Sequence, residues 1–145
     1  MVGTNCLCLY LQRAARALAR RFDEAFRPLD LTSGQFSVMM SLNRPEPPTM
    51  GRVAWGLGMD RTTLTAALKP LERRGLVEIF PDPADRRSRL LKLTPAGKAL
   101  LAKAFPIWKR VHAEIEAPLP SGDPDGLRAD LRALSFPDDP GSGPP

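Results

Sequence analysis

Two apolar patterns of helical period, separated by a short glycine-containing stretch, constrain the fold of this chain more than any other feature. Each pattern repeats at i, i+3, i+4 and i+7, the spacing of one helix face: Met50, Val53, Ala54 and Leu57, then Leu64, Ala67, Leu68 and Leu71. Thr49 and Asp60 are residue types that cap helix N-termini, and Gly58 fits just past a helix end. Residues 49–75 therefore predict a helix-turn-helix.

The second helix of this pair carries hydroxyl and basic side chains on the side that we expect to face away from the core. These residues are Arg61, Thr62, Thr65, Ala66 and Lys69. Short hydroxyl and long basic side chains suit contacts with base edges and phosphates. An antiparallel helix pair with a solvated face would show the same pattern, so this segment alone leaves both interpretations open.

Residues 76–93 predict a β-hairpin directly after the helix pair. Residues 76–80 and 90–93 are strand candidates, and the prolines and aspartates of residues 81–85 favour a turn. A hairpin at this position is a wing, and it carries Arg86, Arg87 and Arg89, which could enter a DNA minor groove. Alternatively, Asp82 and Asp85 neutralise these arginines. Both interpretations can hold if one arginine braces the loop while another reaches outward.

The charge distribution favours an anionic partner. The chain has 145 residues and a net charge of +5, and residues 61–92 contain eight basic and four acidic side chains. Such a patch is typical of nucleic-acid binding, although a solvated surface would look similar. No apolar run approaches the ~20 residues that cross a bilayer, and the N-terminus lacks the basic flank of a signal peptide. We therefore expect a cytoplasmic protein without membrane contact.

Catalysis and metal binding are not indicated by the residue types present. One histidine and two cysteines leave little for a metal site, and no phosphate-binding loop or nucleophile–base pattern occurs. His112 is interpreted as a packing or surface residue. We expect no enzyme activity, no cofactor and no metal.

Helices are predicted on both sides of the winged segment. Residues 5–27 form a helical pattern that Pro28 ends, and its apolar surface is broad enough to contact more than one neighbour. A Thr32–Gln35 capping box opens another helix, Thr94-Pro95 opens a long one, and residues 124–135 could form a last short helix. The Pro- and Gly-rich residues 137–145 are expected to be a disordered tail.

In order and spacing, these features resemble the MarR family of winged-helix transcription regulators over residues 5–135. The resemblance rests on five segments: residues 31–36 (LTSGQF), 60–65 (DRTTLT), 71–77 (LERRGLV), 82–87 (DPADRR) and 93–97 (LTPAG). It implies a mainly α fold with a small β-hairpin wing. Residues 31–94 would form the winged helix-turn-helix DNA-binding region, and residues 1–30 and 95–136 a helical dimerisation region.

The resemblance also implies a homodimer that binds double-stranded DNA, with a repressor as the favoured role. Two recognition helices would enter successive major grooves, about 34 Å apart, on a pseudo-palindromic operator. Carried over by position, the DNA-binding residues would be Arg61, Thr62, Thr63, Thr65, Lys69, Arg86, Arg87 and Arg89. Either Arg86 or Arg87 would be the arginine that enters the minor groove.

Three further expectations concern regulation and the competing classes of function. Family members often respond to small phenolic or aromatic acids, and candidate pocket residues here are Arg16, Arg20, Phe36, Met40 and Trp55. For any one of them, core packing or a surface arginine is the more common explanation. A thiol-based redox regulator acting through Cys6 and Cys8 is an alternative, although their i, i+2 spacing would require helix unwinding for a bridge. A winged-helix module for protein–protein contact is a second alternative, which would favour apolar residues on the recognition face.

Overall fold

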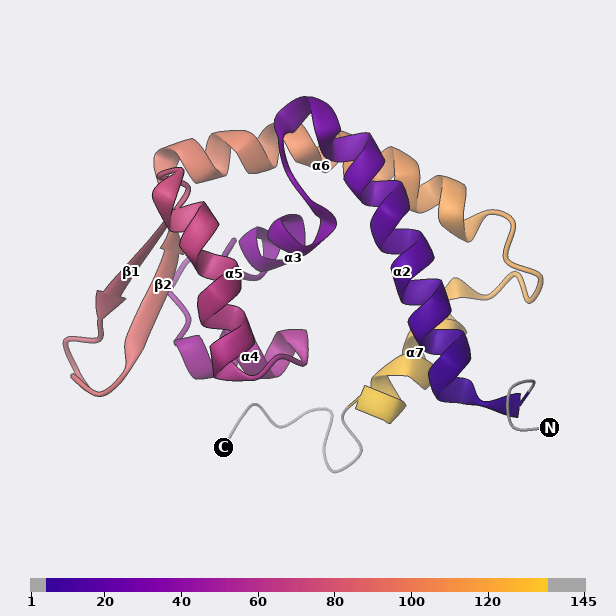
Figure 1. Ribbon diagram of the computed structural model, residues 1–145, viewed down its shortest axis with the longest axis horizontal. Coiled ribbons are helices and arrows are strands. Elements are labelled where there is room, and N and C mark those ends of the chain that lie inside the picture. Colours follow the sequence, from indigo (N-terminus) through magenta and orange to yellow (C-terminus); the bar gives the residue numbers. More distant parts are fainter. Residues whose placement is uncertain (1–4, 136–145) are drawn as a thin grey trace.

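A computed structural model describes residues 5–135 of the chain as a helical protein with one β-hairpin (Figure 1). Its elements in chain order are α2 (Leu7–Phe26), the 3-10 helix η1 (Arg27–Leu29), α3 (Ser33–Ser41), α4 (Met50–Leu57), α5 (Arg61–Arg73), β1 (Val77–Pro81), β2 (Arg89–Leu93), α6 (Pro95–Glu116) and α7 (Pro124–Ser135). The predicted fold class is confirmed. The predicted disordered tail, residues 137–145, lies outside the described residues.

Four helices begin at the residues that the sequence marks as caps. Thr32 forms the full capping box: its hydroxyl accepts the Gln35 N–H at 3.1 Å, while the Gln35 side chain accepts the Thr32 N–H at 3.0 Å. In α4, α5 and α6 the cap side chain likewise accepts the N–H three residues on: Thr49 from Arg52, Asp60 from Thr63, and Thr94 from Gly97. These side-chain caps fix where each helix starts.

The wing is a two-stranded antiparallel hairpin that is anchored at its base. Val77 pairs with Leu93 at the base and Pro81 with Arg89 near the tip. The Leu91 N–H donates to the Pro48 carbonyl at 3.0 Å, so β2 also pairs with the loop that precedes α4. This contact ties the wing to the helix-turn-helix.

The core lies beneath α5 and continues under α6. Seven large side chains are fully buried, from α2, α3, α5 and β2: Phe26, Val38, Met39, Leu64, Leu68, Leu71 and Leu91. Figure 1 shows α3, α4, α5 and the hairpin on one side of the molecule, α2 and α7 on the other, and α6 passing over both. The core of the winged region is therefore continuous with side chains of α2 and α6, such as Phe26 and Leu101.

The N-terminal half of α2 and all of α7 contribute no buried residue to this core. Instead, they expose large apolar side chains, including Leu7 (66% exposed), Leu11 (37%) and Leu134 (58%). Exposed apolar surface of this extent, on two helices, is typical of a protein–protein interface.

Arg74 connects the end of α5 to the entrance of the winged region. Its Nη1 donates to the Asp30 carbonyl at 2.6 Å and its Nη2 to the Leu29 carbonyl at 3.4 Å. Asp30 lies in the left-handed region, with φ of 51°, at the end of η1. The arginine therefore holds the turn between α2 and α3 against the helix that follows the Gly58 turn.

Candidate nucleic-acid interface

The exposed side of α5 is the first part of the candidate interface. Leu64, Leu68 and Leu71 are buried beneath this helix, whereas Thr62 and Lys69 are exposed. Neither Lys69 nor any other exposed side chain of residues 61–69 forms an ion pair with another described residue. This side therefore presents hydroxyl and ammonium groups to solvent.

Two of the predicted contact residues, Thr63 and Thr65, also take part in hydrogen bonds within their own helix. Thr63 donates its N–H to the Asp60 carboxylate at 2.7 Å, and the Thr65 hydroxyl donates to the Arg61 carbonyl at 2.7 Å. Hydrogen bonds from the Thr63 backbone and side chain hold the pKa of Asp60 below its ordinary value, since they stabilise the carboxylate. Thr63 thus belongs to the N-terminal cap as well as to the exposed surface.

Arg61 takes a different direction from the one that the sequence pattern suggests. It precedes Leu64 and Leu68 by three and seven residues, so it lies on the edge of α5 nearest the core face. Its guanidinium group is exposed but lies against α4, where its Nη2 is 3.1 Å from the position that a Cβ on Gly51 would occupy. Arg61 is therefore exposed, as expected, but it lies at the α4 edge of the exposed side and does not point directly away from the core.

The wing tip is the second part of the candidate interface. The Asp82 carboxylate accepts the Ala84 N–H at 2.9 Å, and the Asp85 carboxylate accepts the Arg87 N–H at 3.1 Å. The two acids therefore order the turn through the backbone. Within residues 5–135 no ion pair involves Arg86, Arg87 or Arg89. No ion pair thus supports the predicted neutralisation of these arginines by Asp82 and Asp85.

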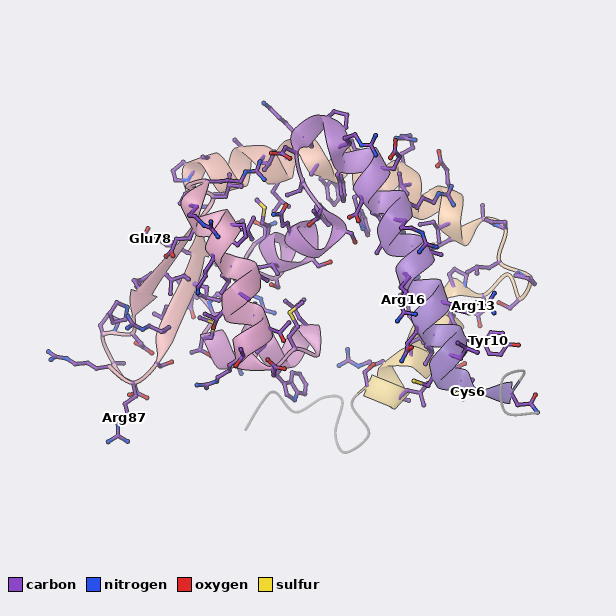
Figure 2. The ribbon with its side chains drawn as sticks, viewed as in Figure 1. Cys6, Tyr10, Arg13, Arg16, Glu78 and Arg87 are labelled. Atoms are coloured by element: carbon purple, nitrogen blue, oxygen red, sulfur yellow. The ribbon has the colours of Figure 1, made fainter. Side chains whose placement is uncertain are left out.

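Figure 2 shows Arg87 at the end of the hairpin, with its guanidinium group pointing away from the protein. Lys92 further down the wing differs, because its ammonium group lies 3.4 Å from the Glu78 carboxylate and 5.1 Å from the Phe80 ring centroid. The available cations of the wing are therefore concentrated at its tip, which is the part that a DNA groove can admit.

The five predicted pocket residues do not converge on one cavity. Phe36 and Met40 line a hollow of about 310 Å³ together with four residues that are not among the predicted pocket residues: Phe22, Ser33, Ser37 and Trp108. In this lining Phe36 stacks on Trp108 with ring centroids 6.3 Å apart, and on its other side it stacks on the buried Phe26 at 4.9 Å. Trp55, half-buried on α4, does not line this hollow.

Arg16 and Arg20 lie elsewhere, on the exposed part of α2. With Arg13 and Tyr10 they line a separate open hollow of about 480 Å³. Figure 2 shows Tyr10, Arg13 and Arg16 along α2. Phe22 and Trp108 belong to helices that the sequence predicts, but only the packing of α2, α3 and α6 brings their rings beside Phe36. No local pattern indicates that convergence.

The two cysteines are free and lie at the start of α2. Cys6 is the N-cap residue, with extended backbone (φ −81°, ψ 106°), and Cys8 is exposed in the first helical turn. The Gln12 amide lies 3.2 Å from the Cys8 sulfur. A disulfide between Cys6 and Cys8 would therefore require unwinding of the first turn of α2 only.

Residues 5–135 contain neither a metal-binding cluster nor a membrane-spanning helix. No cluster of three or more His, Cys, Asp or Glu side chains there could hold a metal ion. None of the helices in this range has the length and apolar character needed to cross a membrane.

Comparison with known proteins identifies the architecture. The sequence pattern of the MarR family matches residues 31–88. The chain is 32% identical to the HTH-type transcriptional repressor NicR of Pseudomonas putida, over 56% of this chain and about half (51%) of NicR. It is 31% identical to the organic hydroperoxide resistance transcriptional regulator of Bacillus subtilis, over 71% of this chain and 70% of that protein.

A solved structure agrees over nearly the whole length. The transcriptional regulator MosR of M. tuberculosis, crystallised in complex with DNA, superposes with a TM-score of 0.83 and 38% identity, covering 92% of this chain and 96% of MosR. These relatives are transcription regulators and not enzymes, in agreement with the sequence analysis. The chain, with its wing, capped recognition helix and flanking helices, belongs to the MarR family of DNA-binding transcription regulators.

Proposed function

We propose that this protein is a homodimeric repressor in the cytoplasm that binds a pseudo-palindromic operator. In each protomer α5 enters a major groove and the wing tip enters the adjacent minor groove. The observation that carries the proposal is the wing tip, where Asp82 and Asp85 accept backbone N–H groups and Arg86 and Arg87 form no ion pair with any of residues 5–135. A minor groove concentrates negative potential and attracts arginine.

The proposed contacts divide into two kinds. Thr62, Thr63 and Thr65 would lie at base edges, because short hydroxyl groups on the exposed side of α5 can donate or accept there. Lys69 and the wing arginines, including Arg89, would neutralise phosphates or enter the minor groove. Phosphate contacts position the protein, whereas base contacts carry sequence preference.

Dimerisation is proposed to use residues 1–30 and 95–136, leaving residues 31–94 as the DNA-binding region. Support comes from the exposed apolar side chains of α2 and α7, such as Leu7 and Leu134, which no part of residues 5–135 covers. A two-fold dimer would set the two recognition helices about 34 Å apart, one turn of DNA.

DNA-binding titrations at several salt concentrations test this proposal. The probe is a fluorescent duplex carrying the promoter region of the protein's own gene, with a scrambled duplex of equal length for comparison. Lys69→Ala and Arg86→Ala should each weaken binding by about tenfold while leaving the melting temperature unchanged. Lys103→Ala, at an exposed position on α6, is the matched control. Unchanged affinity for both interface variants would contradict the proposal.

The hollow beside Phe36 is the proposed site for a small aromatic acid that releases the protein from DNA. Phe22, Phe36 and Trp108 offer ring surfaces, and Ser33 and Ser37 offer hydroxyl groups. A ligand shifts the equilibrium only if it prefers one spacing of the two recognition helices. Titration with 4-hydroxybenzoate should quench tryptophan fluorescence, and Trp108→Phe should remove that signal; quenching that persists in Trp108→Phe would contradict this site.

Peroxide sensing is a second candidate, favoured by the exposed Cys8 thiol beside the non-helical Cys6. An organic hydroperoxide would oxidise one thiolate to a sulfenic acid and leave as the alcohol; the other thiol would then displace water and form a disulfide. Cumene hydroperoxide should weaken DNA binding of the natural protein, and dithiothreitol should restore it. Cys8→Ser should be insensitive. Equal sensitivity of Cys8→Ser would overturn this candidate.

A further inference from the structure

One glycine of α4 lies directly beneath the first side chain of the recognition helix. A Cβ on Gly51 would be 3.1 Å from Nη2 and 3.9 Å from Cζ of Arg61. A contact at 3.1 Å is closer than side-chain carbons ordinarily allow, so the guanidinium group occupies space that is free only because residue 51 lacks a side chain. Glycine lowers the stability of a helix by roughly 1 kcal/mol relative to alanine. At residue 51 this unfavourable residue type stands where the Arg61 guanidinium group packs against the helix.

The second glycine of α4 shows that the contact is specific. Gly56 belongs to the same eight-residue helix, yet a Cβ there would meet nothing within 4 Å. Neither glycine has a positive φ. Backbone conformation therefore does not require glycine at residue 51, whereas a Cβ there would shift the Arg61 guanidinium group by a few tenths of an ångström.

Arg61 is also free to bind an anion. Within residues 5–135 it forms no ion pair, and α4 contains no acidic residue. The nearest carboxylate in sequence, Asp60, accepts the Thr63 N–H. The guanidinium group approaches Gly51 through Nη2 and, without an ion pair in residues 5–135, keeps N–H donors available at the junction of α4 and α5.

We propose that Arg61 binds a DNA phosphate from this junction and that Gly51 is the positioning residue that holds its guanidinium group there. This inference rests on the proposed DNA-binding function and changes the role of one residue. Arg61 neutralises the backbone and sets the register of α5, whereas Thr62 and Thr65 contact bases. A phosphate contact contributes to affinity for every sequence and carries no base preference.

The test is a double-mutant cycle with Gly51→Ala and Arg61→Ala, with Gly56→Ala as the matched control. Binding is measured on the promoter duplex and on a mixed-sequence duplex at several low salt concentrations. Arg61→Ala should weaken binding to both duplexes by the same factor, about tenfold, and reduce the salt slope by about 1. Gly51→Ala should weaken binding by about threefold to tenfold, and the double variant should match Arg61→Ala alone, because the two residues act as one unit.

Gly56→Ala should bind DNA as the natural protein does. Gly51→Ala and Gly56→Ala should both melt at or above the melting temperature of the natural protein, because alanine favours the helix. Additive effects of Gly51→Ala and Arg61→Ala, or a loss confined to the promoter duplex, would overturn the proposal. Arg61→Lys provides a second measurement, since a point charge without the planar group should not be sensitive to Gly51→Ala. Failure of this cycle while Lys69→Ala still weakens binding would reject only the role of Gly51 and Arg61. Loss of salt-dependent DNA binding by the natural protein would reject the function itself.

Discussion

Gly97 lies so close to the backbone of Leu76 that a Cβ on residue 97 would be 2.1 Å from the Leu76 carbonyl oxygen. The same carbonyl accepts the Thr94 N–H at 3.0 Å, and the Thr94 hydroxyl donates to the Gly75 carbonyl at 2.5 Å. The first turn of α6 is thus fixed to the segment that joins α5 to β1. A movement of α6 would therefore be transmitted to both α5 and the wing.

Gly97→Ala should destabilise the protein by about 1–3 kcal/mol, because the new methyl group meets a backbone oxygen that cannot move aside without disturbing the wing. Denaturant unfolding measures this difference. Gly56→Ala, whose methyl group would meet nothing within 4 Å, is the control and should be neutral or slightly stabilising. Equal stability of the two variants would contradict the close approach.

Two substitutions of Asp85 separate the charge of this residue from its role in ordering the wing tip. Asp85→Asn keeps an oxygen acceptor for the Arg87 N–H and removes a negative charge near DNA, so its affinity for a duplex should equal or exceed that of the natural protein. Asp85→Ala removes the acceptor as well and should bind about threefold to tenfold more weakly than Asp85→Asn, a difference of about 1 kcal/mol. Equal binding by the two variants would show that the Arg87 contact does not order the tip.

The cap of α5 should give stability a dependence on pH in the acid range. The pKa of Asp60 is lowered from its ordinary value of 3.8, so its contribution is fully present above that value and is lost as pH falls through the lower folded pKa. Asp60→Ala should therefore be less stable than the natural protein at neutral pH, and the difference should shrink below about pH 4. Unfolding curves across this range give the comparison; a constant difference would rule out the carboxylate as the source.

A charged residue at the exposed apolar surface of α2 should disrupt self-association without unfolding the protomer. Leu18 is 40% exposed, so Leu18→Asp leaves the buried core intact. Sedimentation at micromolar concentration should show a shift from dimer towards monomer, together with weaker DNA binding. A variant that sediments as the natural protein does would remove α2 from the proposed interface.

Local signals in the sequence were sufficient for the elements and their caps. Thr32, Thr49, Asp60 and Thr94 cap the helices as predicted, because capping depends on residues three positions apart. The hairpin and its arginine-bearing tip were also predicted, since strand propensity and turn chemistry are local.

The contacts between elements could not be predicted in the same way. The hollow formed by Phe22, Phe36 and Trp108 depends on how three helices pack, and the contact of Arg61 with Gly51 depends on the angle between α4 and α5. A helical periodicity predicts the helix face on which a residue lies but not the direction that a long side chain takes from it. For that reason Arg61 was expected to face directly away from the core.

Sedimentation velocity of the purified protein with its own promoter duplex, at two ionic strengths, tests the central claim most directly. We expect two chains on each duplex and a log affinity that falls with log salt concentration by a slope of about −0.9 for every phosphate neutralised. A single chain on the duplex, or an affinity that does not change with salt, would contradict it.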